Sequence, residues 1–141
     1  MGAAILLLSA LLSFEDPPRD VIDFFRSVAT SLADAGRDVN TKERIHARDA
    51  ADFLEHFDKS MRGYEEFSSQ IGSMLGAGEV STTIDFINTQ GNDRKRELDL
   101  DWLLLCEGES PKRAVIKCTI EKRGKKWKIT ALAPIEFFKR E

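Results

Sequence analysis

Apolar and polar residues alternate with a period of two over residues 79–138. Four consecutive runs show this alternation, which half-buried antiparallel strands require. Their inward positions are Val80, Thr82, Ile84 and Phe86; Leu98, Leu100, Trp102, Leu104 and Cys106; Ala114, Ile116, Cys118 and Ile120; and Trp127, Ile129, Ala131, Ala133 and Ile135. The sequence therefore predicts a four-stranded antiparallel meander.

The pairing of these strands can also be predicted from the pattern. Neighbouring strands must present their apolar residues to the same side, because a slip of one residue sends a whole set to the opposite face. This condition favours three cross-strand pairs: Phe86 with Leu98, Trp102 with Cys118, and Ile120 with Trp127. The turns then fall at residues 91–93, 109–111 and 123–124, where Gly, Asn and Pro suit tight turns.

Upstream of the strands, apolar residues recur at helical spacing in three segments. The first segment begins with Asp16 as a cap and Pro17 at the first position, and it ends at Gly36. The second follows Asp49, and the third runs from Tyr64 to a pair of glycines. Residues 36–46 are polar and predict a loop. Helices followed by strands indicate a single α+β domain over residues 15–141.

Composition limits the classes of partner. The chain of 141 residues has 42% hydrophobic and 32% charged residues with a formal net charge of −3, which is typical of a soluble domain. Negative net charge argues against nucleic-acid binding. The basic run at residues 122–128 falls on a predicted hairpin tip, where charged residues are normal, so no phosphate or nucleic-acid site is predicted there.

The two cysteines are expected to be buried free thiols. Cys106 and Cys118 share the inward face, but the predicted registers offset them by roughly 13 Å along the strands. A disulfide requires Cα atoms within about 7 Å. With no cationic or histidine neighbour on that face, the thiols are expected to pack rather than to react.

The first 14 residues contain an apolar run at residues 3–12. This run is too short to span a bilayer, but its length suits the apolar core of an export signal. No Lys or Arg precedes it and no cleavage site is evident before Phe14, so a short element packed on the core is the alternative. The sequence thus favours export to the periplasm or exterior if the run is a signal, and a cytoplasmic location otherwise.

The order of elements carries a family resemblance. An amphipathic helix, a short helix in DAADFLEHFD, a third helix and a meander closing on KWKITALAPIEFF resemble the NTF2-like superfamily, also called the cystatin-like α+β fold, with its SnoaL-like or ketosteroid isomerase-like shape. The resemblance starts near Pro17 and implies a curved sheet around the first helix, with a conical pocket between them. The family includes ketosteroid isomerase-like and dehydratase-like enzymes as well as small domains without a known role.

The expected pocket wall consists of one helical and six strand residues: Tyr64, Thr82, Leu100, Trp102, Cys118, Trp127 and Ile129. The strand residues include no carboxylate, His or Lys, so they offer no general acid or base. His46, His56 and Tyr64 are expected to be solvated, edge or core residues. This favours a noncatalytic domain, without a cofactor, whose pocket binds a small hydrophobic molecule or is filled by its own core. An isomerase- or dehydratase-like enzyme with a helix-borne acid or base is the alternative.

Two groups of residues stand out on the predicted outer face. The registers align Asp85, Asp99 and Glu121 in an acidic row, for which solvated surface charge is favoured over a cation or a basic partner. No metal site is predicted beyond this candidate row. Four apolar side chains also point outward: Leu103, Leu105, Val115 and Leu132. Because such patches are usually covered, and NTF2-like domains often pair through their outer faces, a homodimer is predicted, with cover by the N-terminal segment as the alternative.

Overall fold

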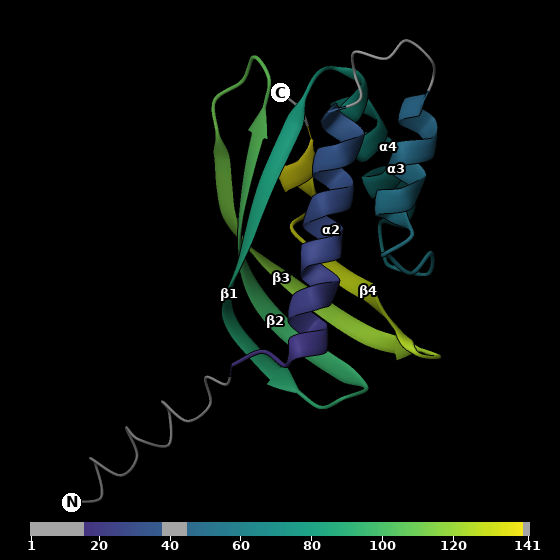
Figure 1. Ribbon diagram of the computed structural model, residues 1–141, viewed down its shortest axis with the longest axis vertical. Helices are drawn as coiled ribbons and strands as arrows, with labels where there is room; N and C mark the ends of the chain where they lie inside the picture. The colour runs from purple at the N-terminus through teal and green to yellow at the C-terminus, as the bar shows by residue number, and fades with distance from the viewer. Residues whose placement is uncertain (1–15, 38–44, 140–141) are drawn as a thin grey trace, which may run out of the picture.

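The computed structural model describes residues 16–37 and 45–139. Three helices precede an antiparallel sheet of order β1-β2-β3-β4, and a short 3-10 helix follows. Their bounds are α2 (Arg19–Arg37), α3 (Ile45–Leu54), α4 (Tyr64–Gly76), β1 (Val80–Gly91), β2 (Lys95–Cys106), β3 (Lys112–Arg123), β4 (Lys126–Ala133) and η2 (Ile135–Phe138). Helix α2 lies across one face of the curved sheet, with α3 and α4 beside it (Figure 1). The predicted α+β class is confirmed; the expectations for residues 1–14 lie outside the described residues.

The helix starts differ from those predicted. In α2, the amides of Val21 and Ile22 donate to the carbonyl of Pro18 at 3.0 Å, so the helix begins at Arg19 and Asp16 does not cap it. Proline suits this place because its missing N–H would have no partner in the first turn. Helix α3 starts at Ile45, before the cap predicted at residue 49. The predicted start was too late because it relied on the apolar residues from Ala50 onward. Among the described helices, none is long and apolar enough to cross a membrane.

The meander is confirmed, but its predicted registers are wrong. The observed pairs are Phe86 with Leu100, Trp102 with Ala114, and Ile120 with Ile129. Each differs from the prediction by two or four positions, and an even shift keeps the apolar side chains on the same face wherever the strands are regular. The pattern of faces therefore cannot distinguish these registers. Glycines fix two of the turns instead, because Gly108 (φ 84°) and Gly124 (φ 67°) adopt left-handed conformations.

Two β-bulges interrupt the alternation. The pairing shifts past Ile87 in β1 and past Thr130 in β4, which leaves each of these residues without a partner across the ladder. Beyond Thr130 the faces exchange, so Leu132 is buried while Ala131 and Ala133 are exposed. The predictions of inward alanines and an outward Leu132 are therefore wrong. Bulges also increase the local twist, which adds to the curvature of the sheet (Figure 1).

The core lies between the inner face of the sheet and the helices. From α2, the ring of Phe25 packs edge-on to Phe86 of β1, with centroids 5.6 Å apart. From the other side, Phe138 of η2 lies 5.2 Å from Phe67 and 5.1 Å from Trp102. The last three side chains are fully buried. Cys106 and Cys118 are buried on the same face and are not joined by a disulfide, as predicted.

The loop between α3 and α4 closes the free edge of β4. Phe57 forms a parallel bridge with Ile129, in which the Ile129 amide donates to the His56 carbonyl and the Asp58 amide donates to the Ile129 carbonyl, each at 2.8 Å. An unpaired strand edge is prone to pairing with other chains, so this bridge protects the sheet.

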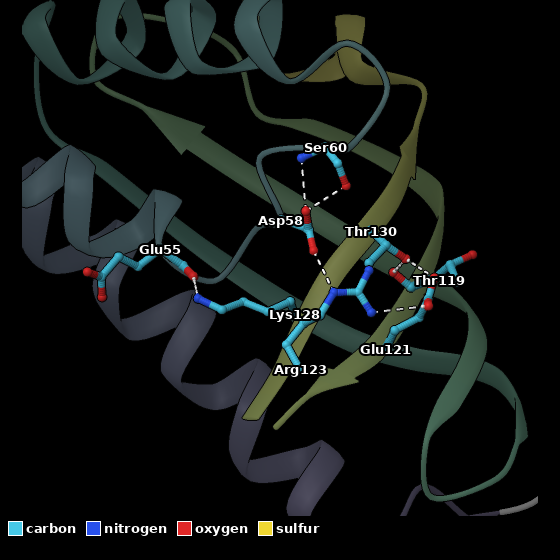
Figure 2. A network of polar contacts seen from close by, with 8 residues as sticks. All are labelled: Glu55, Asp58, Ser60, Thr119, Glu121, Arg123, Lys128 and Thr130. Carbon is cyan, nitrogen blue, oxygen red and sulfur yellow. Dashed lines mark hydrogen bonds and ion pairs between the residues drawn. The ribbon is translucent and has the colours of Figure 1, made fainter. Parts of the chain in front are cut away.

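A polar network fastens the same loop to the β3–β4 hairpin (Figure 2). The Asp58 carboxylate accepts hydrogen bonds from the Ser60 hydroxyl at 2.6 Å, the Ser60 amide at 2.9 Å and Arg123 Nε at 2.8 Å. Arg123 also donates to Glu121 at 3.3 Å, and Lys128 donates to the carbonyl of Glu55. The hydrogen bonds from Ser60 and then Arg123 lower the pKa of Asp58 to about 2.

A second contact holds the start of α2. The Trp127 indole donates to the Asp20 carboxylate at 2.9 Å, and Lys122 lies 5.0 Å from the centre of the Trp127 ring and 3.7 Å from that carboxylate. The hydrogen bond from Trp127 is the main cause of the lowered pKa of Asp20. Trp127 is therefore oriented toward α2 and away from the hairpin tip.

Two glycine substitutions should have opposite effects on stability. A Cβ at Gly72, inside α4, meets nothing within 4 Å, so Gly72→Ala should raise the free energy of unfolding by about 0.5–1 kcal/mol. At Gly91 (φ 140°), a Cβ would collide with backbone atoms of Lys95 and Arg96, so Gly91→Ala should lower it by more than about 1 kcal/mol. Urea denaturation measures both; a stabilised Gly91→Ala variant would contradict the described turn.

The Asp58 contacts should make stability depend on pH. The folded-state pKa of about 2 lies below the value of about 3.9 for an unfolded chain, so the ionised carboxylate stabilises the fold above pH 4. This contribution is lost as the pH falls through 2. The urea midpoint of the natural sequence should exceed that of Asp58→Asn at pH 7, and the difference should shrink toward pH 2. If the difference in urea midpoint is the same at pH 2 as at pH 7, these contacts do not favour the ionised over the protonated carboxyl group.

Candidate functional site

The residues expected to line a conical pocket lie mostly within the core. Five of them are buried beneath the helices: Leu100, Trp102, Cys118, Trp127 and Ile129. Thr82 is half-buried and donates its hydroxyl hydrogen to the Leu103 carbonyl at 2.8 Å. The Trp102 indole N–H is buried without a hydrogen-bond partner in the described part of the chain. At these positions the inner face supplies packing surface, and Tyr64 lies elsewhere, on a cleft beside β4.

A groove of about 920 Å³ lies on the opposite, outer face of the sheet. Two rows of outward residues cross the four strands to form its floor: Asn88, Asp99, Lys117 and Ala133 in one row, and Gln90, Glu97, Thr119 and Ala131 in the next. Arg62 and Gly63 before α4, together with residues 134–136 after β4, form its walls. We call this the outer groove.

The outer groove has one apolar and one polar side. The apolar side follows β4 and the start of η2, with Ala131, Ala133, Pro134 and Ile135. The other three strands contribute amide, hydroxyl and charged groups, including an ion pair of 3.1 Å between Lys117 and Asp99. The side-chain oxygen of Asn88 is buried there and has no hydrogen-bond partner among residues 16–37 and 45–139. This arrangement suits a molecule with an apolar body and at least one polar group.

The titratable residues that line the outer groove are Arg62, Glu97, Asp99, Lys117, Cys118 and Glu136. No histidine is among its lining residues in the described part of the chain. Cys118 is its one cysteine, but the Cys118 side chain lies on the inner face, where burial raises the pKa of the thiol, so the sulfur is protonated at neutral pH and is a poor nucleophile. Lys117 and Asp99 are engaged with each other.

The acidic row predicted from the sequence does not form. Asp85 faces Asp101, Asp99 lies between Asn88 and Lys117, and Glu121 lies between Lys95 and Lys128. The prediction was wrong because it used shifted registers; in the observed ones, lysines lie opposite Asp99 and Glu121. Arg113 binds Asp101 through two hydrogen bonds of 2.9 and 2.6 Å, which lower the pKa of Asp101. No group of three or more potential metal-ligating side chains occurs among the described residues.

An apolar patch lies on the outer face toward the β2–β3 turn. Leu105 is 42% exposed and Val115 54% exposed, and half-buried Leu103 lies two positions before Leu105 on β2, diagonally across from Val115 on β3. We call these three residues the apolar patch. Leu132, predicted to belong to it, is 7% exposed and points into the core because of the bulge at Thr130. Ile87, 45% exposed at the other bulge, was not predicted to face outward.

The two helix-side candidates occupy different clefts. His56 lines a polar groove between α2 and α3, where its ring packs edge-on to Phe24 with centroids 5.6 Å apart. Burial, and secondarily the charge of Lys128, lowers the pKa of His56, so the imidazole is neutral at pH 7. Tyr64 lines the cleft between the α3–α4 loop and β4. Because these side chains line separate clefts, they do not form a joint acid–base site.

Comparison with known proteins identifies the fold. No protein-family model and no curated protein matches the chain. Among solved structures, Bd1075 of Bdellovibrio bacteriovorus is similar to 81% of the chain at 11% identity and a TM-score of 0.62, but the chain spans 38% of its length. A protein of unknown function with a cystatin-like fold from Nostoc punctiforme has 15% identity and a TM-score of 0.56 over 80% of this chain and 85% of its own. An NTF2-like protein of unknown function from Shewanella oneidensis has 13% identity and a TM-score of 0.55 over 80% and 93%. The resemblance predicted from the sequence is confirmed: the chain forms an NTF2-like, or cystatin-like, α+β domain.

Proposed function

We propose that this chain is a noncatalytic NTF2-like binding domain that holds a small, largely hydrophobic molecule in the outer groove. The observation that carries the proposal is the outer groove itself, whose volume of about 920 Å³ falls within the range of roughly 300–1,000 Å³ typical of ligand sites. The apolar side along β4 would receive the body of the molecule. Asn88, with its unpartnered oxygen, would receive a polar group.

The position of this site differs from the one that the family resemblance implies. A ligand in the conical pocket would have to displace aromatic side chains of the core, such as Phe138, which is fully buried and packs against both Phe67 and Trp102. Truncating such side chains costs about 3–5 kcal/mol, so displacing them is unfavourable. The outer groove is already open and requires no such displacement.

A second copy of the chain is the partner that we propose for the apolar patch. Leu105 and Val115 expose large apolar side chains that water solvates poorly. The Arg113–Asp101 ion pair beside them carries both signs of charge. A two-fold interface brings the same residues of both copies together, and a patch with both signs can then complement itself. The outer groove lies toward the β1–β2 turn, and its floor begins at Lys117, two positions along β3 from Val115.

Binding in the outer groove can be tested with the neutral fluorescent probe N-phenyl-1-naphthylamine. Ala131 is exposed on the floor of the groove, so Ala131→Arg should fold normally, fill the groove with a charged side chain and weaken probe binding at least about tenfold. Ser110→Arg, in the exposed β2–β3 turn, adds the same charge elsewhere and should bind as the natural sequence does. Unchanged affinity in Ala131→Arg, or no binding by the natural sequence, would refute the proposal.

Pairing through the apolar patch predicts a dimer in sedimentation equilibrium at tens of micromolar. The double substitution Leu105→Asp and Val115→Asp should raise the dissociation constant at least about tenfold, because it places charges in the interface. Ile87→Asp changes an apolar residue of similar exposure outside the patch and should leave the dimer intact. A natural sequence that sediments only as a monomer would rule out the proposed pairing.

A further inference from the structure

The cleft that Tyr64 lines, where the α3–α4 loop meets β4, has a volume of about 660 Å³. Four cationic side chains line it: Lys59, Arg123, Lys126 and Lys128. We call it the basic cleft. We propose that the basic cleft binds a small amphipathic anion, in which an aromatic or aliphatic body carries a carboxylate or phosphate group.

The charge of the side chains that line the basic cleft differs in sign from the net charge of the whole chain. The four cations of the basic cleft face two acidic side chains, Glu55 and Asp58, although the chain as a whole has a formal net charge of −3. The cleft is therefore a region of positive potential on a negative molecule. Such regions concentrate anions and orient them before contact.

The four cations have two different roles. Arg123 is held between Asp58 and Glu121, and Lys128 donates to the Glu55 carbonyl, so both fix the shape of the cleft (Figure 2). Lys59 and Lys126 are exposed, and neither forms an ion pair with another described residue. These two ammonium groups are available to an anion.

The inner wall of the basic cleft is apolar and aromatic. Leu54, Phe57 and Tyr64 line it; Phe57 is buried, and the other two are half-buried. The Tyr64 hydroxyl makes no hydrogen bond to another residue in the described ranges, and it can donate one to an anionic oxygen. Aromatic surface beneath a cationic rim fits an amphipathic anion better than a free inorganic ion.

The bridge between Phe57 and Ile129 assembles this cleft from distant parts of the chain. It brings Lys59 and Tyr64 beside Lys126 and Lys128, which lie two positions apart on β4, or roughly 7 Å. From the sequence alone, the lysines among residues 122–128 are explained as exposed charges at a hairpin tip. Their position against the α3–α4 loop adds the apolar wall that a ligand site needs.

Titration with 1-naphthyl phosphate, 1-naphthoate and neutral 1-naphthol, followed by amide chemical shifts in ¹⁵N-labelled protein, tests the proposal. At least one of the two anions should shift the amides of Tyr64 and Lys126 saturably, and the tighter one identifies the preferred head group. The neutral probe should leave these two amides in place. Lack of saturable binding by both anions, or equal binding of 1-naphthol there, would overturn the proposal.

Matched lysine variants locate the binding. The double variant Lys59→Ala, Lys126→Ala should weaken anion binding at least about tenfold, because it removes both available ammonium groups. Lys125→Ala removes an exposed lysine of the same hairpin that does not line the cleft, and affinity should stay within about twofold. An equal loss in Lys125→Ala would show that the attraction comes from diffuse charge and would contradict a defined site.

Discussion

Aromatic packing on the inner face of the sheet determines where this domain can bind anything. Phe25 from α2, Phe67 from α4 and Phe138 from η2 pack on that face, and Trp102 is fully buried among them. Edge-to-face contacts of this kind contribute about 0.5–1.5 kcal/mol each beyond the burial of apolar area. Because these side chains occupy the space beneath the helices, the cavities described lie elsewhere: on the outer face, beside β4, and between α2 and α3.

The two bulges determine which side chains the outer face of the sheet presents to solvent. Past Thr130, β4 turns Leu132 into the core and leaves Ala131 and Ala133 outside, where their small side chains leave room for the outer groove. In β1, the bulge at Ile87 places Asn88 in the same row as Asp99 and Lys117. A sheet without these bulges would present a different set of side chains to solvent. The groove therefore depends on local irregularities in the strands as well as on the overall fold.

The sequence predicts the elements well, since their apolar periodicities are strong. The third helix, the four strands and the buried thiols lie as predicted, and the fold resemblance is confirmed. The registers could not be predicted, because shifting a pair by two residues preserves the faces. The sequence does hold one indication of the bulge in β4. Ile129 and Leu132 are three residues apart, so a regular strand cannot bury both, and Leu132 has an alanine on either side. The predicted acidic row was wrong because it relied on the shifted registers, and the outer groove was not predicted because the bulges were not recognised. The basic cleft depends on a bridge between residues 57 and 129, which no local pattern indicates.

The two tryptophan indoles provide the most direct test of a filled inner face. Trp102 and Trp127 both face the core, and their indole N–H groups give two signals in a ¹⁵N–¹H spectrum. During titration with N-phenyl-1-naphthylamine, the amides of Ala131 and Ala133 should shift saturably while the Trp102 indole stays in place. A saturable shift of the Trp102 indole with unmoved amides in the outer groove would place the ligand beneath the helices and contradict the filled inner face.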